Sequence, residues 1–346
     1  MAAPAETSAG TPAKPRTRAE SRRAERPPSG GWRTIAAKEL ADHIASWRFF
    51  VLLLVIGALS LLPVVFTSSD INSVASQASG DPRVFLALFT LGSQSFGGFA
   101  MVQLVLLLVP LVGIAFGFDG VNSERSQGTL SRLLAQPIHR DDVINGKFAA
   151  GIAVISVMMV TLILLVTALG ILRLGIIPSV DDVGRLAVWL VATVLYASFW
   201  LAFALLLSTV IRSTATAALV GFGAWIAVTL IGSILLPIAA NFLFPIDSTA
   251  SISAQYGANT AQELFLRLSP SQLYHDVLTA VMNPSVTALF VNNSGQAASA
   301  QQQIPSLLSI DQSILLVWPQ FVALVALTVL LFALSYVLFL RQEVRA

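Results

Sequence analysis

The sequence LAVWLVATVLYASFWLAFALLLSTVI, from Leu186 to Ile211, carries no charged side chain along its length. An α-helix rises about 1.5 Å per residue, so about 20 apolar residues suffice to cross the ~30 Å hydrocarbon core of a bilayer. The core of a soluble protein does not need an uncharged run of this length. The segment therefore predicts a transmembrane helix.

Five further runs of the same kind lie on either side of this segment, and none contains Asp, Glu, Lys, Arg or His. Over the whole chain 55% of residues are hydrophobic and 11% are charged, whereas soluble domains carry about 25% charged residues. We predict an all-α polytopic membrane protein with six transmembrane helices, in which Pro63, Pro110 and Pro237 kink or end their helices. The other runs are Phe49–Phe66, Phe99–Phe118, Phe148–Leu172, Ala215–Ile238 and Ser313–Leu340.

The basic residues are distributed unevenly between the segments that connect these runs. Sixteen of the 20 lysines and arginines fall on one side: nine precede residue 49, four lie in the loop 119–147, one is Arg212 and two follow the last run. The other four are Arg83, Arg173, Arg185 and Arg267. By the positive-inside rule both termini are expected in the cytoplasm, and the protein in the cytoplasmic (inner or plasma) membrane. Topology therefore explains the pI near 9.2, and no nucleic-acid partner is expected.

Ahead of the first run, the chain divides into two parts. Residues 1–31 are rich in Ala, Pro, Ser, Arg and Glu, which predicts a disordered basic tail, and the transmembrane domain then covers residues 32–346. Trp32–Trp47 has apolar residues at helical spacing, which predicts an amphipathic helix on the membrane surface; a soluble cap helix is the alternative. A cleaved signal peptide is not expected, because Phe49–Phe66 is too long and nearly fifty residues precede it.

Two long segments are predicted on the outer side of the membrane. Residues 67–98 are rich in Ser, Gly and Asn and have weak helical character. Residues 239–312 contain a helical stretch near Glu263–Met282, and loops of this length are usually functional or disordered. We expect this stretch to have an apolar face for the membrane or for a partner, made of Leu264, Phe265, Leu268, Leu273, Val277 and Leu278.

The polar loop between the second and third runs reads DGVNSERSQGTLSRLLAQPIHRDDVINGK, from Asp119 to Lys147. Gly128 permits a tight turn, and residues 129–136 can form two helical turns that Pro137 ends. A second helix is expected to begin around His139 to Asp141. The residues alone leave two interpretations open: a short amphipathic helix that a cytoplasmic partner grips, or a solvated connector.

The run from Glu124 to Lys147 resembles the signature loop of ABC-2 type permeases, with His139 where that family often has a small helix-capping residue. The order of features over residues 32–346 is similar too, and it looks closest to the branch of the nitrous-oxide-reductase-maturation and gliding-motility permeases. The resemblance implies that the loop is a coupling helix that contacts an ATP-binding subunit. Besides Gly146 and Lys147, the matching positions are Glu124, Arg125, Gly128, Thr129, Leu130, Leu133, Leu134, Pro137 and Arg140.

The resemblance implies a permease subunit that couples ATP hydrolysis on a separate nucleotide-binding subunit to movement, with export as the more common use. A second permease chain, identical or different, and membrane lipid are the other expected partners. The chain has no phosphate loop of the form Gly-x-x-x-x-Gly-Lys-Ser/Thr and no cysteine, and its three histidines are scattered. No catalytic, cofactor-binding or metal-binding residue is therefore predicted.

Three other functions compete with this interpretation. A secondary transporter usually holds ionisable residues inside the membrane, and the six runs as drawn hold none. An intramembrane enzyme needs a catalytic constellation, but the Asp141–Asp142 and Asp181–Asp182 pairs are interpreted as charges at helix starts. The third is an ABC-type mechanotransmitter, in which ATP moves the 239–312 segment against an extracytoplasmic partner.

Overall fold

A computed structural model describes residues 31–77, 83–92, 98–126, 128, 139–175, 177–247, 249, 251–283 and 308–341. In these ranges the chain forms helices and turns and contains no strand. The all-α prediction is confirmed. Residues 1–30 and the segment 129–138 lie outside the described ranges, so the predicted tail and the predicted helix over 129–136 stay predictions.

Within the described residues, six helical segments are long and apolar enough to cross a membrane, as predicted. Each contains one of the predicted runs or most of it and extends beyond it by a few residues, except the first, which keeps the predicted end at Phe66. Pro63, Pro110 and Pro237 lie inside helices that continue past them, so none of the three ends a span. The segments are Trp47–Phe66, Met101–Ser126, Arg140–Arg173, Val180–Val210, Thr214–Leu243 and Ile310–Arg341.

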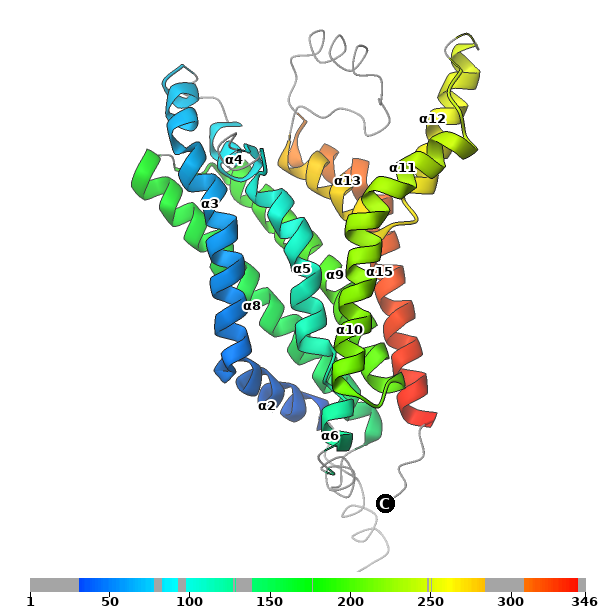
Figure 1. Cartoon of the computed structure of the whole chain (residues 1–346). Helices are drawn as coiled ribbons and strands as arrows, with labels where there is room; N and C mark the ends of the chain where they lie inside the picture. The colour runs from blue at the N-terminus through cyan, green and yellow to red at the C-terminus, as the bar shows by residue number, and fades with distance from the viewer. Residues whose placement is uncertain are drawn as a thin grey trace, which may run out of the picture.

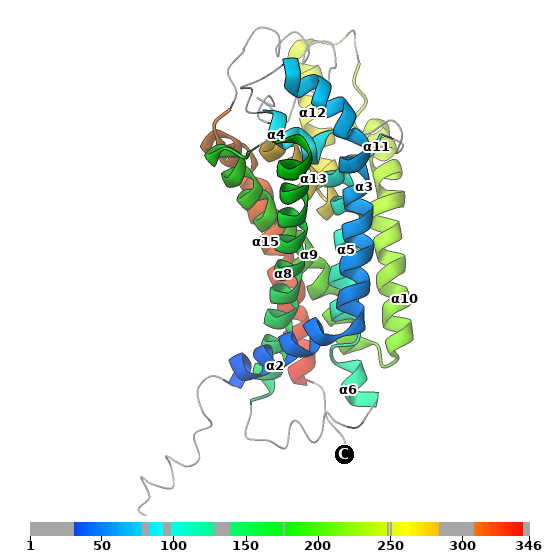
Figure 2. The same ribbon diagram turned by 90° about the vertical axis from the view of Figure 1, so that its left-hand side faces the viewer.

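The spans are built from α3 (Trp47–Gln77), α5 (Met101–Gly117), α8 (Arg140–Leu174), α9 (Val180–Val210), α10–η2–α11 and α15 (Ile310–Arg341). At one end of the bundle lie α2 (Gly31–Ala45), α6 (Asn122–Ser126), the turn between α9 and α10, and the end of α15 (Figures 1 and 2). Helices α4 (Arg83–Thr90), α12 (Ile252–Leu266) and α13 (Pro270–Met282) lie toward the opposite end. The segments predicted to share a side therefore do share an end, and its assignment to the cytoplasm remains a prediction.

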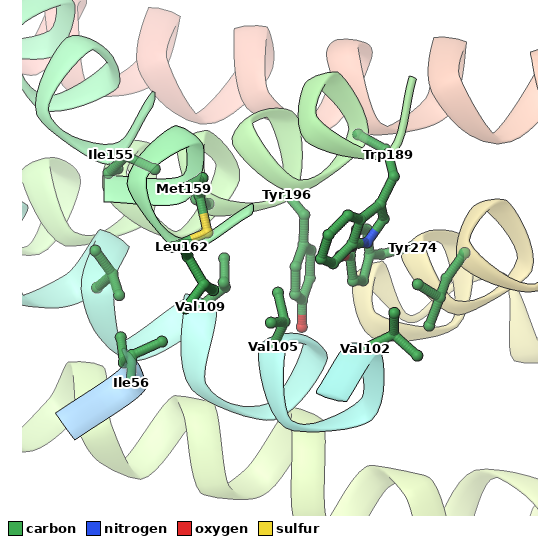
Figure 3. Packing of buried hydrophobic residues seen from close by; sticks show 14 of the residues in the cluster. Ile56, Val102, Val105, Val109, Ile155, Met159, Leu162, Trp189, Tyr196 and Tyr274 are labelled. Carbon is green, nitrogen blue, oxygen red and sulfur yellow. Dashed lines mark hydrogen bonds between the residues drawn. The ribbon is translucent and has the colours of Figure 1, made fainter. Parts of the chain in front are cut away.

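Close packing of α5 on α9 forms the centre of the bundle. A Cβ atom on Gly113 would lie 2.5 Å from the Ala197 carbonyl oxygen, and one on Gly117 would lie 2.7 Å from Ala204 Cβ. Because the two glycines are four residues apart, they lie on one face of α5. The α5 backbone can therefore approach α9 closely, as small residues allow between transmembrane helices. Figure 3 shows α3, α8 and α13 adding side chains around this pair, among them Ile56, Ile155 and Tyr274.

The segment predicted as a loop over 67–98 contains more helix than its composition suggested. Helix α3 continues to Gln77, and α4 follows at Arg83. Phe85 and Phe89 of α4 are buried in the main hydrophobic cluster, where Phe89 lies edge-on to Trp189. The sequence signal was obscured because only eight residues form α4, too few for a clear helical period.

The predicted helical stretch Glu263–Met282 is two helices, not one. Helix α12 ends at Leu266, a turn follows, and Pro270 begins α13. The predicted apolar face is divided accordingly: Leu273 and Val277 are buried in the bundle, whereas Leu264 and Leu268 are 59% and 72% exposed. Proline is favoured at a helix start and not in a helix interior, so Pro270 was the overlooked signal.

The fifth span is interrupted near its middle. It runs as α10 (Thr214–Trp225), then a π-helical segment η2 (Ile226–Ile231), then α11 (Gly232–Leu243). The wider turn is visible in the hydrogen bond from the Gly232 N–H to the Ala227 carbonyl, five residues back. Such π-helical turns are rare inside helices and are frequent at functional sites.

Candidate coupling site

The described part of the 119–147 loop begins as a tight continuation of α5. Residues 118–121 form a turn, α6 follows, and Gly128 adopts a left-handed conformation with φ +67°, which confirms the predicted tight turn at this glycine. Its N–H donates to the Arg125 carbonyl at 3.2 Å. Glycine adopts this backbone conformation at no steric cost, which explains its presence at this turn.

The turn after α5 is bound to the end of α9. The hydroxyl oxygen of Ser208 accepts hydrogen bonds from the N–H groups of Val121 and Asn122, at 2.9 and 3.1 Å. Gly120 lies so close that a Cβ there would be 2.8 Å from a methyl group of Leu205. The loop therefore starts from a fixed point on the bundle, and Ser208 satisfies backbone donors that no helical carbonyl reaches.

A buried lysine joins three elements at this end. The Lys147 Nζ lies 2.7 Å from Glu124 Oε1 of α6 and 3.1 Å from Glu39 Oε1 of α2, and its side chain is 7% exposed. A desolvated ammonium is costly unless it is paired, and here two carboxylates pair it. Lys147 stands on α8, so this ion cluster connects the interfacial helix, the loop and the third span.

Apolar contacts reinforce the same junction. A Cβ on Gly146 would meet Ile35 at 2.7 Å, so α2 lies directly on the base of α8. Ile35 joins Val121, Ile144 and Phe339 in a small buried cluster. Side chains from α2, the turn after α5, α8 and α15 thus meet in one place.

Helix α2, which was predicted to lie on the membrane surface, therefore also packs against the bundle. Ile35 is buried, whereas Trp32 and Trp47 are 40% and 80% exposed, as expected for aromatic side chains at a membrane interface. At the other end of α2, the imidazole of His43 lies edge-on to Phe116, and burial lowers the pKa of this histidine despite nearby Glu39 and Asp119.

The start of the first span is also tied to the loop. Arg48 forms an ion pair with Asp119, and its guanidinium lies over the Phe118 ring, 5.2 Å from the ring centre. The arginine side chain is 52% exposed, so the pair orients the loop more than it stabilises the fold.

The helix after the loop begins where the sequence predicted. His139 is the N-cap residue with extended backbone and no capping hydrogen bond from its side chain, and α8 starts at Arg140. Asp141 and Asp142 lie in the first turn, where carboxylates interact favourably with the helix dipole, as interpreted from the sequence.

Of the predicted coupling residues, Glu124 and Arg125 lie on α6, Gly128 follows it, and Arg140 is exposed at the start of α8. Thr129, Leu130, Leu133, Leu134 and Pro137 lie outside the described residues, so their role stays a prediction. Sequence reasoning missed Glu39, Asp119 and Ser208. Their partners are distant in the sequence, and an acidic or hydroxyl side chain at a helix end gives no signal of which partner it has.

A second polar cluster lies toward the opposite end and was not anticipated. Arg185 is 1% exposed and pairs with Asp181 at 2.7 Å, and its guanidinium also donates to the carbonyls of Val281 and Leu308. Arg267 pairs with the buried Asp276 at 2.9 Å. The six predicted runs contain no ionisable residue, and this absence was the argument against a secondary transporter. The fold brings these charged side chains against the spans, so that argument is weaker.

The charged groups do not form a metal centre in the part of the chain that the structure describes, where no three His, Cys, Asp or Glu side chains gather as ligands. The charged groups at the α2 end instead connect helices to one another. The loop 119–147 connects the second span to the third. Hydrogen bonds, ion pairs and apolar contacts fix both of its ends.

The sequence was compared with curated proteins and with models of protein families. A search of curated proteins finds no match. The model of the family described as ABC-2 family transporter protein matches residues 33–344, which include all six spans and the whole loop. The chain therefore belongs to the ABC-2 family of transporter proteins, as a multi-pass membrane permease subunit.

Proposed function

We propose that a separate ATP-binding subunit contacts the loop 119–147, and that the loop transmits the movement of this subunit to the second and third spans. The observation that carries the proposal is the Lys147 ion cluster, which joins α6 and α2 to the base of α8. A force applied to the loop reaches α8 through this cluster and reaches α5 and α9 through the turn bound by Ser208. The loop faces the cytoplasm in this proposal, as the positive-inside rule predicts.

The transporter assembled in this way contains two permease chains, identical or different, and two ATPase subunits. The family match supports association with an ABC ATPase and a dimeric arrangement. Export of a substrate is the use we propose. The assignment to the branch of the nitrous-oxide-reductase-maturation and gliding-motility permeases remains a prediction.

The test is a charge reversal at Arg125 and a polar substitution at Leu133. We expect Arg125→Glu and Leu133→Asp to leave the protein in the membrane but to reduce co-purification of the ATPase subunit and its stimulation about tenfold or more, as for lost interface anchors. Arg173→Glu, an exposed position at the far end of α8, is the control. Recovery of the ATPase at wild-type yield with both loop variants would count against the proposal.

A mechanotransmitter is the second candidate, and the exposure of α12 supports it. Helix α12 projects from the bundle (Figure 1), and its Tyr256 and Leu264 side chains are 64% and 59% exposed. Exposed apolar side chains of this size suit a partner surface. Tyr256→Glu combined with Leu264→Glu should then abolish the cellular function while ATPase stimulation is retained; export that continues unchanged would remove this candidate.

A further inference from the structure

A pocket of about 140 Å³ lies between the second and fifth spans and the turn that joins α12 to α13. Leu106 of α5 and Leu236 of α11 contribute apolar surface, and Thr229 of η2 lies among them. Ser233, Ser271 and His275 add polar groups. The pocket thus combines a mostly apolar lining with a few hydrogen-bonding groups, as small-molecule sites commonly do.

The lining changes from rim to floor. Ser233 and His275 are exposed, Ser271 is half-buried and Thr229 is 5% exposed. A molecule that enters therefore passes the exposed Ser233 hydroxyl and His275 imidazole before it meets the buried Thr229 hydroxyl.

The buried Thr229 hydroxyl makes no hydrogen bond of standard distance and angle among the described residues, although the Tyr196 hydroxyl faces it. Two other polar groups of the pocket are engaged: Ser233 donates to the Leu230 carbonyl at 2.7 Å, and the Ser271 hydroxyl lies 2.7 Å from that of Ser269. A buried hydroxyl without a partner is uncommon and calls for an explanation. A ligand group at the floor of the pocket supplies one.

Two more buried polar groups converge behind Thr229. The Tyr196 hydroxyl faces Thr229 and Trp200, and both that hydroxyl and the Trp200 indole nitrogen also lack a partner at hydrogen-bond distance and angle among the described residues. In Figure 3 the Tyr196 hydroxyl points toward α5 near Val105. The site therefore offers hydrogen-bonding capacity at a depth where the rest of the packing is apolar.

The π-helical turn accounts for the position of Thr229. An extra residue in the turn shifts the side chains that follow out of α-helical register, which moves a polar group onto a face it would not otherwise occupy. Gly232, at the end of this turn, also lines the pocket and adds no side chain to fill it.

The chemistry of the lining selects the class of ligand. No Asp, Glu, Lys or Arg is among the lining residues, so a charged group would be desolvated there without a partner. The volume is close to that of cavities that accept a ring of six heavy atoms. We propose that the pocket binds the head of an uncharged amphiphile, a glycerol-sized group with two or three hydroxyls, whose acyl or alkyl chain lies along α11.

This ligand site holds whether or not the ATPase assignment does, since binding needs no ATP hydrolysis. The experiment therefore uses the full chain alone, in nanodiscs of phosphatidylcholine, with 1-monolauroylglycerol as the probe. If the probe does not bind, the ligand site is wrong and the coupling proposal is unaffected. If the loop variants do not alter ATPase co-purification, the coupling proposal is wrong and the ligand site is unaffected.

The chain contains no cysteine, so single cysteines can be labelled without background. Ser271→Cys places a thiol at the pocket, and Ser253→Cys places one at an exposed position of α12 as the control. We expect monolauroylglycerol to slow maleimide labelling of the Ser271→Cys protein and to leave labelling of the Ser253→Cys protein unchanged. Lauroyl lysophosphatidic acid, with the same chain and a phosphate, and dodecyl maltoside, with a larger head, should protect weakly.

Adding Thr229→Val should raise the apparent Kd about three- to tenfold, the loss expected for one hydrogen bond between neutral groups. Thr229→Ser should restore binding. Thr328→Val is the matched control, because the buried Thr328 hydroxyl already donates to the Leu324 carbonyl. The proposal is overturned if the probe gives no protection at Ser271→Cys, if the lysophosphatidic acid protects equally, or if Thr229→Val and Thr328→Val act alike.

Discussion

At the end of the bundle that carries α2, one ammonium group, that of Lys147, links three elements, whereas at the end that carries α13 the links are redundant. Tyr274 of α13 stacks on Tyr196 with ring centres 4.7 Å apart, and its hydroxyl bonds to Trp189 and Thr193. The Arg185 guanidinium bonds to several groups around the same helix. Several hydrogen bonds thus hold helix α13, whereas the ionic link at the α2–α6–α8 junction depends on Lys147 alone, beside the apolar packing of Ile35 on α8.

We propose that the junction of α2, α6 and α8 is the part that moves, because its ionic link depends on one side chain whereas several hydrogen bonds hold α13. The junction of α2, α6 and α8 also lies beside the proposed contact with the ATPase. In the proposed mechanism, movement of the ATPase there would tilt α8 and α5 while α13 holds the opposite ends of α9 and α15 together.

The largest effect is expected from removing the Arg185 guanidinium. Arg185→Met leaves the Val281 and Leu308 carbonyls without their donor, so we expect a loss of about 3–5 kcal/mol in the free energy of unfolding, because each buried acceptor left unsatisfied costs about 1–3 kcal/mol. Arg173→Met, at an exposed arginine, should change little. Unfolding in detergent titrations measures both variants. A loss no larger than that of the control would mean that α13 is not fixed in the way described.

A smaller loss of stability but a larger loss of coupling is expected at Lys147. Lys147→Met leaves the carboxylates of Glu39 and Glu124 facing each other, but both are partly reached by water, so we expect about 2–3 kcal/mol. Stimulation of the ATPase by the permease should fall further than for Arg185→Met. Lys38→Met, at a lysine that is 65% exposed, is the control.

The contrast between the two ends would be broken if Lys147→Met left ATPase stimulation intact, or if it destabilised the protein as much as Arg185→Met. It would be sharpened if Glu39→Gln reduced stimulation and left stability nearly unchanged, because the second carboxylate, on Glu124, still pairs the lysine.

Much of the fold could be predicted because length and charge determine which segments cross a bilayer. The run Leu186–Ile211, the turn at Gly128 and the helix start at Arg140 each rest on a local physical rule, and each is found. The burial of α13 in the bundle could not be predicted, because its apolar face suits the membrane or a partner equally well and the residues that cover it come from three distant spans. The Lys147 cluster was missed for a similar reason, since Glu39 and Lys147 meet only when α2 packs on α8.

The smallest effect is expected from Glu263 of α12, and it depends on pH. Burial, together with Asp276, raises the pKa of the Glu263 carboxyl to about 7, although Arg267 opposes the shift. The folded protein therefore holds a proton there that the unfolded chain, with its ordinary pKa near 4.5, has lost between about pH 5 and 7.

The sign follows from this difference in bound protons. Because the folded state binds more protons in this window, the stability of the wild-type protein should fall as pH rises from about 5 toward 7 and then level off. Glu263→Gln cannot ionise and should flatten this slope, with thermal unfolding at pH 5.5 and 7.5 as the measurement. Equal slopes for the two proteins would show that Glu263 is not desolvated. In that case the α13 end would be more open to water than the buried network around Asp276 implies, and the contrast with the Lys147 junction would narrow.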